Sequence, residues 1–180
     1  IAFRDINPTL HNYVIVTHRS LRKAASGYLD PVIALAGYRA LPEGGGFDTL
    51  VLNIDQVYDQ FNYGETSPRA IFQFMKFCAS VKLPEYLFLV GKGLDVNYGY
   101  HRFPSAFTVY RDLVPTAGYP ASDMAFTTGL SSSPHAPAVA TGRLAANVPG
   151  DVAAYLNKIK ERDALPFDDV NRKKILHLTG

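Results

Sequence analysis

The sequence predicts an α/β domain with a mostly parallel sheet and helices on both faces. Short apolar runs, typical of strands that are covered on both faces, alternate along the chain with stretches of helical apolar spacing. Such an alternation of strands and helices is in turn typical of parallel sheets. The length of 180 residues suits one such domain. We expect a lead-in over residues 1–11 and a single α/β subdomain over residues 12–180.

The first part of the chain contains two predicted strands and a helix. Residues 13–17 are apolar and β-branched and form the first strand. Asp30 followed by Pro31 is the signal of an N-cap and a first helical turn. The second strand is predicted over residues 47–54, with a short helical turn over residues 55–61.

A second helix and a third strand follow. Ser67 and Pro68 repeat the capping signal, and the third strand is predicted over residues 86–90. The helix between them carries apolar residues at positions i, i+3, i+4 and i+7, which define one buried face: Ile71, Phe74, Met75 and Cys78.

Residues 94–136 are irregular and rich in glycine, proline, serine and tyrosine, with weak strand signals at residues 113–114 and 124–128. So long a loop in a compact domain is usually a functional or an interface element. After this segment, the alternation of predicted strands and helices resumes. A fourth strand is predicted over residues 138–141, and the last elements are a helix over residues 152–162 capped by Asp151 and a strand over residues 174–179.

Composition excludes several classes of function. Hydrophobic residues make up 47% and charged residues 19%, which are ordinary values for a globular domain. The net charge of +2 comes from scattered basic residues, so nothing indicates nucleic acid as a partner. No apolar run approaches the roughly 20 residues of a membrane-spanning helix, so no transmembrane segment is expected. Because the chain begins at Ile1 and stops at Gly180 after an apolar run, we expect a segment of a longer protein.

The candidate functional residues lie mostly where strands end, because ligands of parallel sheets bind at the carboxyl ends of the strands. We consider five residues as possible parts of a cleft or of a subdomain edge: His18, Lys92, Asp95, Asp123 and Arg143. Each has a simpler interpretation. His18 also suits a polar turn, Lys92 lies in a glycine-flanked turn, and Asp123 could tie down its loop through backbone N–H groups.

No cofactor site is predicted. Asp95, Asp112 and Asp123 offer oxygen ligands in the irregular segment, and a structural calcium ion is the one candidate there. Cys78 is the only cysteine, but it falls on the apolar face of its helix. A catalytic thiolate needs a nearby base and a partly exposed, electropositive setting. We therefore expect Cys78 to be a buried core residue, and we identify no catalytic residue in this chain.

Several motifs together resemble the gingipain-type cysteine peptidase family. The motifs run in the family's order over nearly the whole chain: Val57–Gly64 (VYDQFNYG), Ser67–Ile71 (SPRAI), Tyr86–Gly91 (YLFLVG), Tyr119–Asp123 (YPASD) and Thr141–Leu144 (TGRL). One position departs from the family pattern. Members commonly have aspartate after the glycine that ends the third strand, where this chain has Lys92, so a role that needs an acid at that position is in doubt.

The resemblance implies a caspase-like fold of two side-by-side subdomains, with the catalytic His and Cys in the second. This chain matches the first, so the expected partners are the catalytic subdomain of the same protein and polypeptide substrates. The motif spacing is most similar to members that act as the sortase of the type IX secretion system. That similarity implies an extracellular or outer-membrane-associated location.

Two other interpretations stay open at this point. The chain could belong to an inactive homologue that serves as a structural part of a secretion machine, or it could be a small α/β module that binds a ligand at its strand ends. A second half that lacks the His or the Cys would favour the inactive homologue. A tight ligand bound by this chain alone would favour the binding module.

Overall fold

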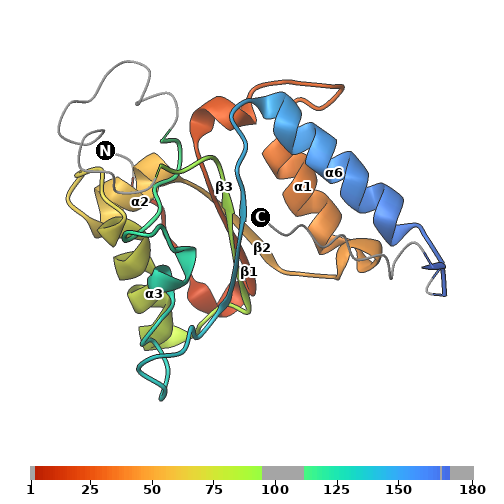
Figure 1. Cartoon of the computed structure of the whole chain (residues 1–180). Coiled ribbons are helices and arrows are strands. Elements are labelled where there is room, and N and C mark those ends of the chain that lie inside the picture. Colours follow the sequence, from red (N-terminus) through yellow and green to blue (C-terminus); the bar gives the residue numbers. More distant parts are fainter. Residues whose placement is uncertain (1–2, 95–111, 167, 171–180) are drawn as a thin grey trace.

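The computed structural model describes residues 3–94, 112–166 and 168–170. Its centre is a parallel sheet (Figure 1), in which the order of the strands is β2-β1-β3-β4. The four strands are β1 (Tyr13–Thr17), β2 (Thr49–Asn53), β3 (Tyr86–Val90) and β4 (Ala140–Leu144). The predicted α/β fold with a parallel sheet is confirmed.

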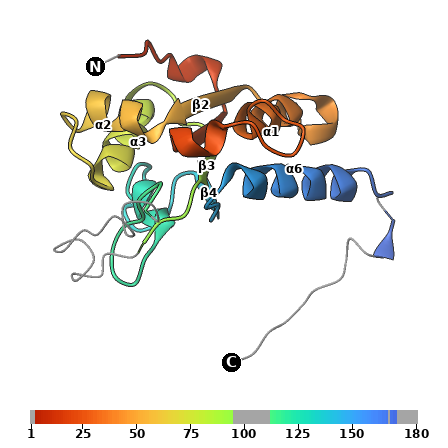
Figure 2. The same ribbon diagram turned by 90° about the horizontal axis from the view of Figure 1, so that it is seen from above.

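Helices cover both faces of the sheet, as Figure 2 shows from above. On one face lie α1 (Pro31–Ala40) and α6 (Pro149–Asp163), which contact each other. On the other face lie α2 (Ile54–Phe61) and α3 (Arg69–Val81). Four short 3-10 helices complete the described elements: η1 (Pro8–Leu10), η2 (Arg19–Arg22), η3 (Pro42–Gly44) and η4 (Asp123–Phe126). None of the helices in these described parts is both long and apolar enough to span a membrane.

Two hydrophobic clusters hold the layers together, one on each face of the sheet. Because side chains alternate along a strand, Val14 and Val16 pack under α2 and α3, while Tyr13 and Ile15 pack under α1 and α6. Ile15 and Val16 are completely buried. The central strand β1 is therefore covered on both faces, which explains its uniformly apolar sequence.

The capping signal at Asp30 operates as expected, whereas the one at Asp151 does not. The carboxylate of Asp30 accepts hydrogen bonds from the backbone N–H groups of Val32 and Ile33, both at 3.0 Å. These bonds satisfy donors that the first turn of α1 leaves unpaired. The carboxylate of Asp151 lies inside α6 and accepts from the N–H groups of Asn147 and Val148 in front of the helix. The helix therefore begins at Pro149, three residues earlier than the cap signal predicted.

Several predicted elements were wrong. The second strand ends at Asn53, and residues 54–61 form a full helix, α2, where only a short turn was expected. The fourth strand lies two residues later than predicted, at Ala140–Leu144, because its register is set by pairing with β3 and not by local propensity. The weak strand signals at 113–114 and 124–128 correspond to no strand; the second coincides with η4. The predicted strand over residues 174–179 lies outside the described residues.

Candidate functional site

Some of the candidate residues predicted from the sequence lie together near the carboxyl ends of the parallel strands. His18 directly follows β1, Lys92 follows β3, and Arg143 is the fourth residue of β4. Asp123 comes from a different element, the first position of η4, and its carboxylate meets the guanidinium of Arg143. The fifth candidate, Asp95, lies outside the described residues.

His18 is the N-cap of η2. Its Nδ1 accepts a hydrogen bond from the backbone N–H of Ser20 at 3.2 Å and lies 2.7 Å from the Ser20 hydroxyl. Burial lowers the pKa of the imidazole below its ordinary value, against an opposing effect of the Asp55 carboxylate, and Arg19 lowers it further. A neutral imidazole suits this cap, because its unprotonated nitrogen must accept the bond.

Lys92 anchors the irregular segment through its backbone. Its carbonyl oxygen accepts from the N–H groups of Leu113, at 2.8 Å, and Val114, at 3.2 Å. The flanking glycines permit this close approach. A Cβ on Gly91, where φ is +148°, would lie 2.8 Å from a methyl carbon of Val114, and one on Gly93 would lie 2.7 Å from the Val114 carbonyl oxygen. The Gly-Lys-Gly sequence is thus explained by backbone packing against residues 113–114.

Arg143 and Asp123 form the closest charge pair of the site. Nε and Nη2 of Arg143 each donate to one oxygen of the Asp123 carboxylate at 2.7 Å. Both side chains are largely buried, with 14% and 20% of their surfaces exposed. Such a paired, two-point contact is stronger and more directional than an ordinary surface ion pair. It joins residues that are twenty positions apart in the chain.

The remaining acidic candidate does not join them in a cation site. Asp112 accepts a hydrogen bond from the backbone N–H of Leu94 at 3.2 Å, and both oxygens of Asp123 face Arg143. Within residues 3–94, 112–166 and 168–170, no group of three or more His, Cys, Asp or Glu side chains could hold a metal ion. Because Asp95 is not described, the calcium hypothesis stays a prediction.

Cys78 lies in the core, as its helical spacing predicts. Its side chain is buried on α3 in the cluster that includes Phe74 and Met75. Burial raises the pKa of the thiol to about 12, so the thiolate form that a nucleophile requires is strongly disfavoured at neutral pH. The chemistry of this thiol is that of a small hydrophobic side chain.

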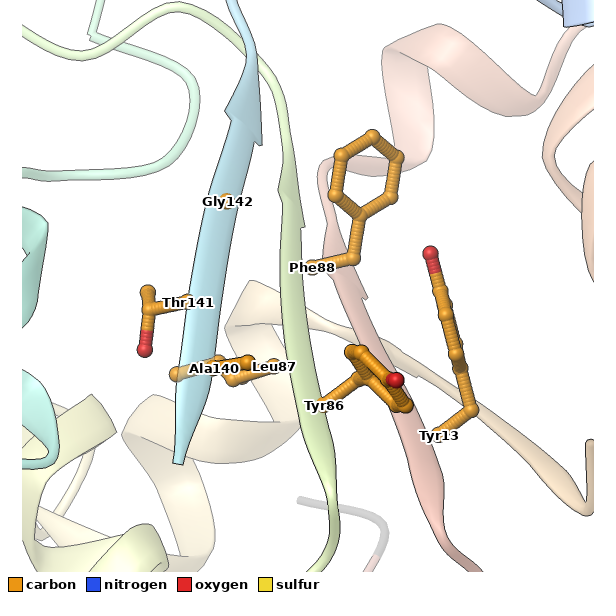
Figure 3. Close-up of a pocket in the computed structure, with 7 residues that line it drawn as sticks. All are labelled: Tyr13, Tyr86, Leu87, Phe88, Ala140, Thr141 and Gly142. Carbon is orange, nitrogen blue, oxygen red and sulfur yellow. The ribbon is translucent and has the colours of Figure 1, made fainter. Parts of the chain in front are cut away.

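A hollow of about 240 Å³ lies on the outer part of the sheet beside β4, and sequence reasoning did not find it (Figure 3). Aromatic side chains from two strands line one side, with Tyr13 and Tyr86 stacked at 5.5 Å between ring centroids. The other side is formed by β4, where the small residues Ala140 and Gly142 leave space above the sheet. No motif marks such a hollow, because it depends on which strands become neighbours.

Comparison with known proteins identifies the family. The model of peptidase family C25 matches residues 6–180. This chain belongs to peptidase family C25. A search of curated proteins found no match to the C25 chain. Among solved structures, the chain is similar to dimeric latent PorU from Porphyromonas gingivalis, with a TM-score of 0.60 and 18% sequence identity. The match covers 82% of this C25 chain and 15% of the PorU chain, so this chain spans a small part of that relative's length.

Proposed function

We propose that this chain is the non-catalytic subdomain of a gingipain-like cysteine endopeptidase and supports a catalytic subdomain of the same protein. The observation that carries the proposal is the state of Cys78. Family membership calls for a reactive thiol, yet the thiol of this chain is enclosed by hydrophobic side chains and its pKa is raised to about 12. On this proposal, the reactive cysteine belongs to another part of the protein.

The free edge of β4 supports the same proposal. β4 pairs with β3 on one side only, so its outer backbone N–H and C=O groups have no partner strand among the described residues. All five of its residues are exposed or half-buried, whereas β1 is buried throughout. Together with the neighbouring aromatic hollow, this edge offers unpaired backbone and apolar surface to a further domain.

A thiol-reactive peptide probe tests the proposal. The chain alone and a longer protein that contains it are incubated with the probe, and covalent labelling is measured by mass spectrometry. We expect labelling only in the longer protein, at a cysteine outside this chain, and we expect the Cys78→Ala variant to be labelled as fully as the wild type. Labelling of Cys78 itself would contradict a non-catalytic role for this chain. A longer protein that is never labelled would contradict a working peptidase and would favour the inactive homologue.

A narrower proposal concerns the biological role. The spacing of the motifs supports a peptidase that processes secreted proteins, as the sortase of a type IX secretion system does, at an extracellular or outer-membrane-associated location. Deleting the gene in the source organism and measuring the carboxy-terminal peptides of secreted proteins by mass spectrometry tests this role. Secreted proteins that keep their carboxy-terminal signals are the expected result, and normal processing would rule the role out.

A further inference from the structure

Arg143 binds both ends of one surface turn. The turn spans residues 117–122 and is closed by a hydrogen bond of 2.7 Å from the N–H of Ser122 to the carbonyl of Ala117. Before the turn, the guanidinium donates to the carbonyl oxygens of Val114, at 2.7 Å, and Pro115, at 2.9 Å. After the turn, it holds Asp123. One side chain thus fixes both ends of the turn to β4.

These contacts use the whole hydrogen-bonding capacity of the guanidinium. Arginine has five N–H donors and no acceptor. Besides the four bonds to the turn's flanks, Nη1 donates to the carbonyl of Gly91 at 2.7 Å. Since each donor has a protein acceptor, Arg143 has none left for the carboxylate of a ligand. Its role is to position other residues, and the feature it positions is the turn.

The turn projects beyond β4 on the side away from β2. In Figure 2 the green-cyan segment that contains it extends past the row of strands at the β4 side. Tyr119 lies within the turn and is 78% exposed. A tyrosine combines a large contact area with few rotatable bonds, and such residues are enriched where proteins bind each other. The turn and the outer edge of β4 therefore lie on the same side of the sheet.

We propose that Arg143 and Asp123 are a positioning pair that holds the turn 117–122 against the remaining part of the same protein, with Tyr119 as a contact residue. This inference rests on the proposed function, in which further polypeptide packs against the β4 flank. The length of the solved relative supports this occupant, because the matched region is 15% of that chain and much polypeptide remains to cover such a flank.

Hydroxyl-radical footprinting tests the contact without any mutation. The oxidation rate of Tyr119 is compared between this chain and the longer protein, with Tyr63, which is fully exposed in the connection between α2 and α3, as the internal control. We expect the rate at Tyr119 to fall about fivefold in the longer protein, because interface contacts exclude water, while the rate at Tyr63 stays unchanged. Equal rates at Tyr119 in the two proteins would overturn the proposal.

Two variants of the longer protein separate positioning from general stability. Asp123→Asn removes the charge partner of Arg143 and is expected to restore the oxidation of Tyr119 to its rate in this chain. Asp30→Asn breaks another partly buried pair, Arg22–Asp30 at 2.8 Å, and is expected to leave Tyr119 protected. If both variants expose Tyr119 equally, or if neither does, the pair has no special positioning role.

The proposed function and this inference can fail separately. Labelling by the thiol-reactive probe reports on the peptidase, and protection of Tyr119 reports on the contact. If the longer protein is not labelled but protects Tyr119, the peptidase proposal is wrong and the positioning role of the pair is supported. If the longer protein is labelled but Tyr119 stays accessible, the peptidase proposal is supported and the proposed contact of Tyr119 is wrong.

Discussion

The two edges of the sheet end in different ways. At the β2 edge the chain covers its own strand. The guanidinium of Arg4, from the lead-in, donates to the carbonyl oxygen of Val51 at 2.6 Å. Leu50 and Leu52 of the same strand are buried. At the β4 edge no residue of the strand is fully buried. Exposed strand edges invite pairing with other chains, and proteins normally protect them. Among the described residues only the β2 edge has such a cover, and this difference supports our proposal that further polypeptide packs against β4.

The largest expected effect comes from removing a leucine side chain at each of the two edges. Leu52→Ala at the β2 edge removes a fully buried side chain and is expected to lower the free energy of unfolding by about 2–5 kcal/mol. Leu144→Ala at the β4 edge removes a half-buried one, for which we expect roughly half that loss. Urea denaturation of both variants measures the difference. Equal losses would mean that β4 is as well packed as β2.

A smaller effect is expected from the arginine that covers β2. Arg4→Ala removes the hydrogen bond to Val51 and exposes that carbonyl oxygen to water. We expect the free energy of unfolding to fall by about 0.5–1.5 kcal/mol. Lys76→Ala, at an exposed position of α3, is the matched control and should change the unfolding free energy by less than about 0.5 kcal/mol. If the two variants are equally stable, Arg4 does not protect the edge.

His18, which directly follows β1 between the two edges, is expected to make the stability depend on pH. Because burial lowers the folded-state pKa of His18, the unfolded chain binds the proton more readily. The contribution of the neutral cap is fully present above the unfolded pKa of about 6.5 and is lost as the pH falls through the folded pKa. His18→Asn keeps a capping side chain without the titration. Urea midpoints at about pH 5 and about pH 8 should differ less in this variant than in the wild type; an unchanged difference would contradict the assignment.

The smallest effect on this chain is expected at the open edge itself. A Cβ at Gly142 meets ring atoms of Phe88 at ordinary contact distances of 3.6 and 3.8 Å, so Gly142→Lys fits the strand. We expect the unfolding free energy of this chain to change by no more than about 0.5 kcal/mol. In the longer protein the added charge would lie at the proposed interface and should abolish labelling by the thiol-reactive probe. Full labelling of that variant would show that the β4 edge stays uncovered.

Sequence reasoning identified features that local spacing sets and missed those that form where distant segments meet. Cys78 is recognisable as a core residue because its helix repeats apolar residues at the spacing of one face. The pairing of Arg143 with Asp123 was not predicted, although both residues were singled out, because η4 and β4 become neighbours only when the loop before β4 folds back onto the sheet. The motifs at Tyr119–Asp123 and Thr141–Leu144 contained both partners, and their joint presence was the only available signal.

Most of the helices and strands, and the resemblance to the family, could be recognised from the sequence. Apolar runs define strands that are covered on both faces, periodic apolar residues define helices, and the ordered motifs indicate a C25 peptidase. Strand order, the register of β4, the aromatic hollow and the positioning of the turn 117–122 were decided by the tertiary structure alone. The reason is physical: periodicity reports how one segment meets the core, whereas a sheet edge or an ion pair depends on which segments become neighbours.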